Sequence, residues 1–117
     1  MKVKDLMTSQ VATAAPNMPL NQVASQMRDY NVGSIPVCDQ SGKVLGIVTD
    51  RDIVLRSVAS GNMQVNAQDV MSRNMVYATP DMDVHEAAKL MAENQIRRLP
   101  VVQNGKITGI LSIGDLA

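Results

Sequence analysis

Two stretches of the chain share one pattern: residues 35–52 read IPVCDQSGKVLGIVTDRD, and residues 99–115 read LPVVQNGKITGILSIGD. Each has an apolar run around a proline, a polar connection, and a second apolar run ending in Gly-x-x-(Thr/Ser)-x-x-Asp. Asn104-Gly105 in the second connection favours a tight hairpin, because both positions tolerate positive φ. The expected hairpins pair residues 35–38 with 44–48, and residues 99–102 with 107–111.

The same register continues upstream of both hairpins. A shift of 64 positions places residues 4–37 over residues 68–101 without a gap, and one deleted residue in the turn then aligns the glycine motifs. Identical residues recur at Met7/Met71, Pro16/Pro80, Ala24/Ala88, Met27/Met91, Pro36/Pro100, Gly46/Gly109 and Asp52/Asp115. Such self-similarity is typical of a repeated supersecondary unit. We divide the chain into repeat 1 (1–61) and repeat 2 (62–117), with the final helix of repeat 2 cut short.

Each repeat is expected to begin with a short strand and a helix. Val11 to Thr13 and Met75 to Ala78 read as strands, each closed by a proline. Apolar residues at three- and four-residue spacing then predict a helix, with Asn17 and Asp81 as caps. The predicted helical faces comprise Leu20, Val23, Ala24 and Met27 in repeat 1, and Val84, Ala87, Ala88 and Met91 in repeat 2.

A second helix is expected after the first hairpin. Residues 50–60 carry its pattern, and Gly61 is placed to end it in the left-handed conformation. VKDLM (residues 3–7) and AQDVM (residues 67–71) read as helical lead-ins to the repeats. A unit of this size with one thin sheet cannot bury both faces alone, so we expect the two repeats to fold as a pair.

Composition excludes several classes of protein. Eleven basic and eleven acidic side chains cancel, and the only aromatic residues are Tyr30 and Tyr77. The chain therefore lacks the positive field and the stacking platforms that bind nucleic acid. No stretch approaches the roughly 18 apolar residues of a membrane span, so a cytoplasmic location is the default expectation.

No catalytic or metal constellation is recognisable. Cys38 lies in an apolar run without a partner, which favours a buried inert thiol. His85 has no further ligand at suitable spacing, which favours a surface position over metal binding. Neither a nucleophile with its base nor a glycine-rich phosphate loop of Walker or Rossmann spacing is present. We therefore expect no enzyme activity and no required cofactor.

The phrases VGSIPV and IRRLPVV before the hairpins, with GIVTDRD and GILSIGD after them, make the chain resemble the cystathionine-beta-synthase (CBS) domain family. The similarity covers nearly the whole chain, and both copies agree in helix pattern, hairpin proline and terminal motif. It implies an α/β fold of two β-α-β-β-α CBS repeats packed with pseudo-twofold symmetry, a Bateman module. It also implies a homodimer, because the family commonly assembles as flat four-repeat discs. The apolar helical faces of both repeats, which exceed what two thin sheets cover, favour the same assembly.

The resemblance further implies a regulatory module that binds AMP, ADP, ATP or another adenosine derivative, such as adenosylmethionine, in a cleft between the repeats. The motif residues that would contact ribose and phosphate are Gly46, Thr49 and Asp52 in repeat 1, and Gly109, Ser112 and Asp115 in repeat 2. The positions that would line the adenine slot are Val11, Ile35, Pro36, Met75, Leu99 and Pro100, with backbone groups of Ala12 and Val76 at the adenine edge.

The motif chemistry suits such a ligand. A hydroxyl beside the free N–H groups of a helix start favours an anion, and a carboxylate three residues on accepts vicinal ribose hydroxyls. Arg97 and Arg98 occupy the positions of Gly33 and Ser34 in repeat 1, so the two sites are expected to differ. Because the final helix of repeat 2 is cut short, we expect the motif with Thr49 and Asp52 to dominate.

Simpler interpretations remain open at this stage. Thr49-x-x-Asp52 and Ser112-x-x-Asp115 also match a helix capping box, and one side chain can serve both purposes. Arg97 and Arg98 are equally consistent with a solvated loop pair. The alternative function is a ligand-free dimerisation or protein-interaction module of the same fold, acting on a regulated protein that the sequence does not identify.

Overall fold

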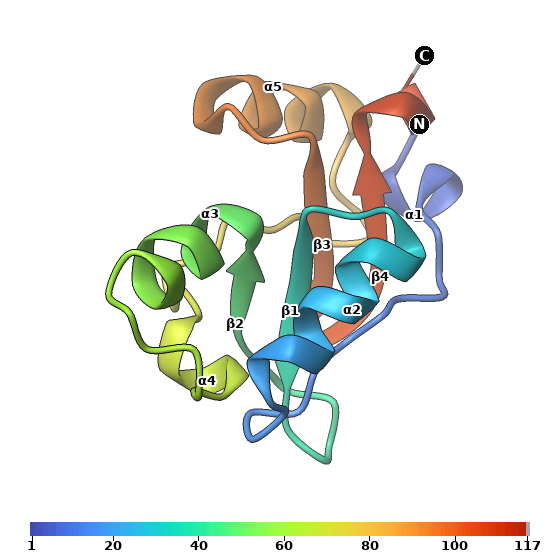
Figure 1. Ribbon diagram of the computed structural model, residues 1–117. Helices are drawn as coiled ribbons and strands as arrows, with labels where there is room; N and C mark the ends of the chain where they lie inside the picture. The colour runs from blue at the N-terminus through green and yellow to red at the C-terminus, as the bar shows by residue number, and fades with distance from the viewer. Residues whose placement is uncertain (117) are drawn as a thin grey trace. The chain divides into compact units, whose positions relative to one another are not determined.

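The computed structural model describes residues 1–116 (Figure 1). Its contacts divide the chain into two compact units. The central unit is Ala12–Met75, and the terminal unit joins Met1–Val11 to the residues from Val76 onward. This division differs from the repeat boundary between residues 61 and 62, because the lead-in of each repeat packs into the other repeat's unit. Each unit is thus one repeat's helix and hairpin completed by the other repeat's lead-in.

The two units contain the same kinds of element. The central unit contains α2 (Leu20–Tyr30), β1 (Ser34–Cys38), β2 (Val44–Thr49), α3 (Asp50–Ile53), the π-helical η1 (Val54–Val58) and α4 (Ala67–Val70). The terminal unit contains α1 (Val3–Leu6), α5 (Val84–Asn94), β3 (Arg98–Gln103), β4 (Lys106–Ser112) and the 3-10 helix η2 (Ile113–Leu116). The mixed α/β fold with two repeated strand pairs is therefore confirmed, as are both lead-in helices.

Both predicted hairpins are present. β1 pairs antiparallel with β2, and β3 pairs antiparallel with β4, each with one register shift late in the first strand. In the second hairpin Asn104 and Gly105 adopt φ values of 53° and 78°, as the tight turn requires. The first hairpin has a longer connection, in which Gly42 supplies a φ of 88°.

The two short strands predicted upstream of the helices are wrong in extent. The bridged residue is Ala14, just after the predicted strand Val11 to Thr13, and Ala78, the last residue of the predicted strand Met75 to Ala78. Ala14 N–H donates to the Pro36 carbonyl at 2.9 Å, and Cys38 N–H donates to the Ala14 carbonyl at 2.9 Å. A parallel ladder would next need donors from Pro36 and Pro16, which have no N–H. Ala78 repeats the arrangement on β3, so prolines limit both ladders to a single bridge.

On the opposite edge of each hairpin lies a lead-in segment. Ser72 bridges Ile47 of β2, and Thr8 bridges Ile110 of β4, each through a pair of backbone hydrogen bonds of 2.8–3.0 Å. The hairpin edges are therefore covered by backbone from the segments that follow α4 and α1.

Each unit has its own apolar core. In the central unit the buried cluster comprises Ala14, Leu20, Val23, Met27, Ile35, Val37, Val48, Ala67, Val70 and Met71. In the terminal unit it comprises Val3, Ala78, Ala87, Met91, Leu99, Val101 and Leu111. Of the predicted helical faces, Ala24 is exposed, whereas Val84 and Ala88 are half-buried. The remaining face residues are buried, so the periodicity located the core correctly.

The predicted helix caps are wrong by two residues. α2 begins after Pro19 and α5 after Asp83, not after Asn17 and Asp81. The Asp83 carboxylate accepts a hydrogen bond from the His85 backbone N–H at 2.8 Å, and this bond holds the pKa of Asp83 below its usual value. Asp81 is instead an ion-pair partner of Lys4 in the lead-in segment, at 3.2 Å.

Candidate functional site

The Thr49 motif of the central unit lies where β2 passes into α3. Thr49 is the N-cap, and its hydroxyl accepts from the Asp52 backbone N–H at 3.0 Å. The hydrogen bonding is reciprocal, because Asp52 Oδ2 accepts from the Thr49 backbone N–H at 2.9 Å. The capping interpretation is thus confirmed for this motif. Asp52 is 8% exposed, and a carboxylate is rarely buried to this extent unless it has partners.

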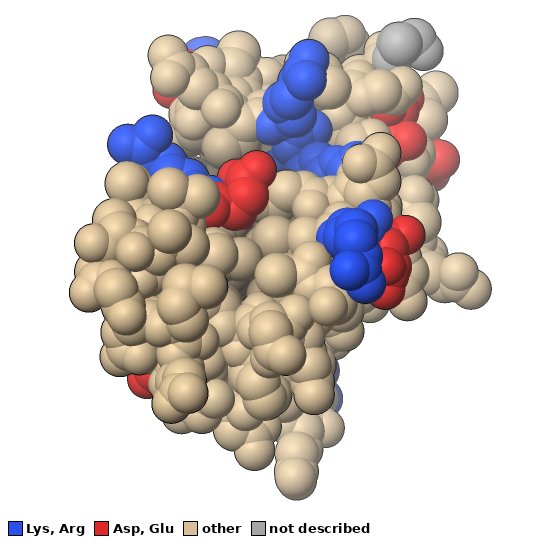
Figure 2. Space-filling view, in the orientation of Figure 1, with Lys and Arg blue, Asp and Glu red and all other residues tan. Residues whose placement is uncertain are grey.

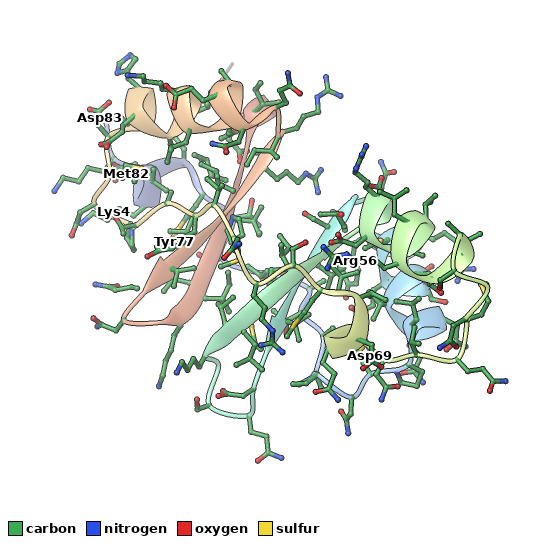
Figure 3. All side chains as sticks on the ribbon, turned by 90° about the vertical axis from the view of Figure 1, so that its left-hand side faces the viewer. Lys4, Arg56, Asp69, Tyr77, Met82 and Asp83 are labelled. Carbon is green, nitrogen blue, oxygen red and sulfur yellow. The ribbon has the colours of Figure 1, made fainter. Side chains whose placement is uncertain are left out.

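The other Asp52 oxygen contacts two residues that the sequence did not reveal. Oδ1 accepts from the Ser72 hydroxyl at 3.2 Å and lies 4.0 Å from Arg56 Nε. Arg56 Nη1 also donates to the carbonyls of Val70 at 3.2 Å and Met71 at 3.0 Å, at the end of α4 (Figure 3). The ion pair between Asp52 and Arg56 could have been found from their i, i+4 spacing in the helix predicted over residues 50–60.

The corresponding motif of the terminal unit has fewer contacts. Asp115 Oδ2 accepts from the Ser112 backbone N–H at 2.8 Å and from the Ser112 hydroxyl at 3.0 Å. Within residues 1–116, Oδ1 of Asp115 has no hydrogen-bond partner, and the residue is half-buried. The Asp115 carboxylate is therefore more available to a ligand than that of Asp52.

The residues beside the two motifs differ in charge. Arg98 pairs in register with Ser112, and the Arg97 carbonyl accepts from the Ile113 N–H at 2.8 Å. In the central unit the aligned residue Gly33 leaves room for a carboxylate, because a Cβ there would lie 3.2 Å from Asp50 Oδ2. The terminal motif thus has two arginines where the central motif has a glycine next to an aspartate.

The motif glycines have a packing role. A Cβ on Gly46 would lie 2.7 Å from the Ser72 carbonyl oxygen and 2.9 Å from Met71 Sδ. A Cβ on Gly109 would lie 2.9 Å from the Thr8 carbonyl oxygen and 2.7 Å from Met7 Sδ. Both glycines are therefore required for the lead-in segment to approach the hairpin, whatever they contribute to a ligand.

The predicted adenine-slot residues fall into two groups. Ile35 and Leu99 are core residues of the central and terminal units, and Pro36 and Pro100 are also fully buried. Their side chains fill their own units. The second group is half-buried and is divided by the unit boundaries, with Ala12 and Met75 in the central unit and Val11 and Val76 in the terminal unit.

The remaining reactive side chains occupy ordinary positions. Burial raises the pKa of the Cys38 thiol, which disfavours the reactive thiolate. The exposed His85 ring lies 3.0 Å from the Asp83 carboxylate at the start of α5. Among residues 1–116 there is no group of three or more histidine, cysteine or acidic residues that could hold a metal ion. The same residues include no helix long and apolar enough to cross a membrane.

Comparison with known proteins relates both repeats to one family. The CBS domain model matches residues 3–58 and again residues 67–117. The CBS domain-containing protein YhcV of Bacillus subtilis is 48% identical over 116 residues, which is 98% of this chain and 82% of that protein.

Solved structures agree in fold. CBSX2 in complex with AMP has a TM-score of 0.86 and 27% identity, with 98% of this chain and 92% of that chain covered. The CBS domain pair of MJ0100, in complex with 5-methylthioadenosine and S-adenosyl-L-methionine, has a TM-score of 0.87 and 28% identity over 99% and 92% of the two chains. The chain therefore belongs to the CBS domain family and contains a pair of CBS domains.

Proposed function

We propose that this CBS pair is a non-enzymatic regulatory module, located in the cytoplasm, that binds adenosine-containing ligands of the AMP, ADP and ATP class. The observation that carries the proposal is the hydroxyl and carboxylate pair at the end of a strand, present in both units as Thr49 with Asp52 and Ser112 with Asp115. Two related CBS structures contain AMP or S-adenosyl-L-methionine with methylthioadenosine, so the family supports this ligand class.

The carboxylate of each motif would bind the ribose. Its charged oxygens accept the two vicinal hydroxyls in bonds about twice as strong as those between neutral groups. Asp115 has Oδ1 without a partner among the described residues, whereas Asp52 must exchange an existing partner for the ligand. The half-buried residues Val11, Ala12, Met75 and Val76 remain candidates for contact with adenine.

The charges favour different ligands at the two motifs. Arg97 and Arg98 have no carboxylate partner within 4.0 Å among residues 1–116, so both guanidinium groups are available for phosphate. Asp50 beside Gly33 would repel phosphate at the central motif. For AMP, ADP and ATP we therefore favour the terminal motif, which departs from the sequence-based prediction that the motif with Thr49 and Asp52 dominates. Adenosine has no phosphate, so for adenosine the Asp52 motif remains a candidate.

Regulation requires a difference in binding free energy between two states of the module. A ligand transmits a signal only to the extent that it binds one conformation, or one partner complex, more tightly than the other. The regulated partner would be another protein that distinguishes these states.

The test is equilibrium binding of the full chain to AMP, ADP, ATP, NAD and S-adenosyl-L-methionine, with thermal unfolding alongside. A ligand at about 100 times its dissociation constant should add about 2.7 kcal/mol to the free energy of unfolding. The increase follows because the ligand binds only the folded chain. If no adenosine compound at millimolar concentration binds or raises the melting temperature, the proposal fails and the ligand-free interaction module replaces it.

A homodimer is the second part of the proposal. Val54, Leu55 and Val58 on η1 are 54%, 52% and 52% exposed. Arg56 on the same turn donates to the end of α4, and the surface where η1 lies is mainly uncharged on the face shown in Figure 2. Soluble monomers rarely leave such apolar patches exposed to water. A second copy of the chain, bringing the same patch, would cover it.

Leu55→Lys is expected to convert the dimer to a monomer, because a buried lysine at an apolar contact must be desolvated without a partner. Light scattering at tens of micromolar should show the halved mass. Gln40→Lys, on the exposed turn of the first hairpin, adds the same charge and should leave the dimer intact. A wild-type mass of 12.6 kDa would contradict the dimer.

A further inference from the structure

Both oxygens of the Asp52 carboxylate already have partners inside the central unit. Oδ2 accepts from the Thr49 backbone N–H at 2.9 Å, and Oδ1 accepts from the Ser72 hydroxyl at 3.2 Å. The Asp52 side chain is only 11% exposed, so water supplies little of its hydrogen bonding. A ligand hydroxyl at Oδ1 would share this largely buried oxygen with Ser72 or displace Ser72 from it.

Ser72 belongs to a segment that Arg56 holds as well. Arg56 Nη1 donates to the Val70 and Met71 carbonyls, which end α4 and have no partner within that helix. Arg56 lies on η1, a π-helical turn of the kind found frequently at functional sites. Asp52 and Arg56 together therefore anchor residues 70–72, shortly before the chain leaves the central unit at Met75.

The terminal unit offers a built-in comparison. Thr8 is aligned with Ser72, and it bridges Ile110 as Ser72 bridges Ile47. Among residues 1–116, however, the Thr8 side chain makes no hydrogen bond to Asp115, whose partner is Ser112. The anchoring contact is thus specific to the central unit, although the backbone arrangement is shared.

We infer that Ser72 and Arg56 determine the affinity of the Asp52 motif, because Ser72 competes with a ligand's ribose hydroxyl for Asp52 Oδ1. The inference rests on the proposed function, and it adds that ligand binding releases residues 70–72 from Asp52. Thermodynamic linkage makes this coupling reciprocal. The factor by which ligand binding weakens the contact between residues 70–72 and Asp52 equals the factor by which that contact weakens ligand binding.

The first test titrates adenosine into the full chain and follows the amide NMR signal of Asp52, which reports this motif separately from the terminal one. Ser72→Ala is expected to bind adenosine about three- to tenfold more tightly, because the competing hydrogen bond is gone. Thr8→Ala is the matched control and should leave the affinity unchanged. With 2′,3′-dideoxyadenosine, which lacks the two vicinal ribose hydroxyls that Asp52 would accept, the gain in Ser72→Ala should disappear.

The second test measures amide hydrogen exchange at Ile47 and Ser72, whose backbones bond to each other at 3.0 and 2.8 Å. Ser72→Ala without ligand, and the wild type saturated with adenosine, should both exchange about threefold faster or more than the free wild type.

Equal or weaker adenosine binding by Ser72→Ala would overturn the competition while leaving the proposed function in place. Unchanged exchange in ligand-free Ser72→Ala would overturn the anchoring of residues 70–72. Failure of the wild type to bind adenosine at Asp52 would overturn the ligand-driven release. Failure to bind any adenosine compound at either motif would overturn the proposed function as well.

Discussion

Gly46→Ala is expected to lower the free energy of unfolding by about 2–3 kcal/mol, and the melting temperature by about 10 °C. The new Cβ would lie 2.7 Å from the Ser72 carbonyl oxygen, which accepts the hydrogen bond from the Ile47 N–H. The backbone of Ser72 has to move away from β2, and this movement weakens the bridge between Ser72 and Ile47. Gly109→Ala should lower the stability similarly, because its Cβ would lie 2.9 Å from the Thr8 carbonyl oxygen. Urea unfolding followed by circular dichroism measures the stability of both variants.

Gly114→Ala is the control for this experiment. Gly114 lies outside the left-handed region, and the nearest atom to its Cβ would be Ser112 Oγ at an ordinary 3.8 Å. Its stability should stay within about 0.5 kcal/mol of the wild type. If Gly46→Ala were as stable as the wild type, the close approach of the lead-in segment to Gly46 would be absent in solution. Contact with a ligand would then be the remaining role for this glycine.

Replacing both Arg97 and Arg98 by alanine is expected to reduce AMP affinity about ten- to a hundredfold, because phosphate loses two charged donors beside Ser112. Adenosine has no phosphate, so its affinity should change less than twofold. Isothermal titration of both ligands into the same protein measures the contrast. The fold should survive, because Arg97 is exposed and Arg98 half-buried.

Arg28→Ala supplies the control for net charge, because Arg28 is an exposed residue of α2 whose only ion pair is with its neighbour Asp29 among residues 1–116. It should leave AMP binding unchanged. An equal loss of AMP and adenosine affinity in the double variant would mean that the arginines shape the fold of the site instead of binding phosphate. If the double variant lost affinity for neither AMP nor adenosine, Arg97 and Arg98 would be a solvated loop pair, the interpretation that the sequence equally allowed.

The hairpins and helices were predictable because their signals are local. Alternating apolar residues, Asn104-Gly105 and the three- and four-residue helical spacing all act within a few positions of the chain. The single bridges at Ala14 and Ala78 were not predictable in extent. Their limit depends on Pro36 and Pro100, which lie on the strands with which they pair.

In the candidate site, too, only the contacts between residues close in the sequence were predictable. Thr49 and Asp52 are three residues apart, and their spacing alone predicts the capping contact that the structure contains. Ser72 lies 20 residues from Asp52 and meets it only because the lead-in of repeat 2 packs against β2. The packing units interleave the two repeats, and no local pattern indicates this exchange.

That interleaving has a consequence for the order of folding. The central unit is one continuous segment, Ala12–Met75, so all of its chain emerges from the ribosome before α5 does. The terminal unit closes only when Thr8 meets Ile110, a contact between the two ends of the chain. Because contacts of long sequence separation form slowly, the central unit should be complete during synthesis while Val3 and Leu6 still lack their core. A nascent chain is thus expected to expose the apolar side of α1 to water until β4 emerges.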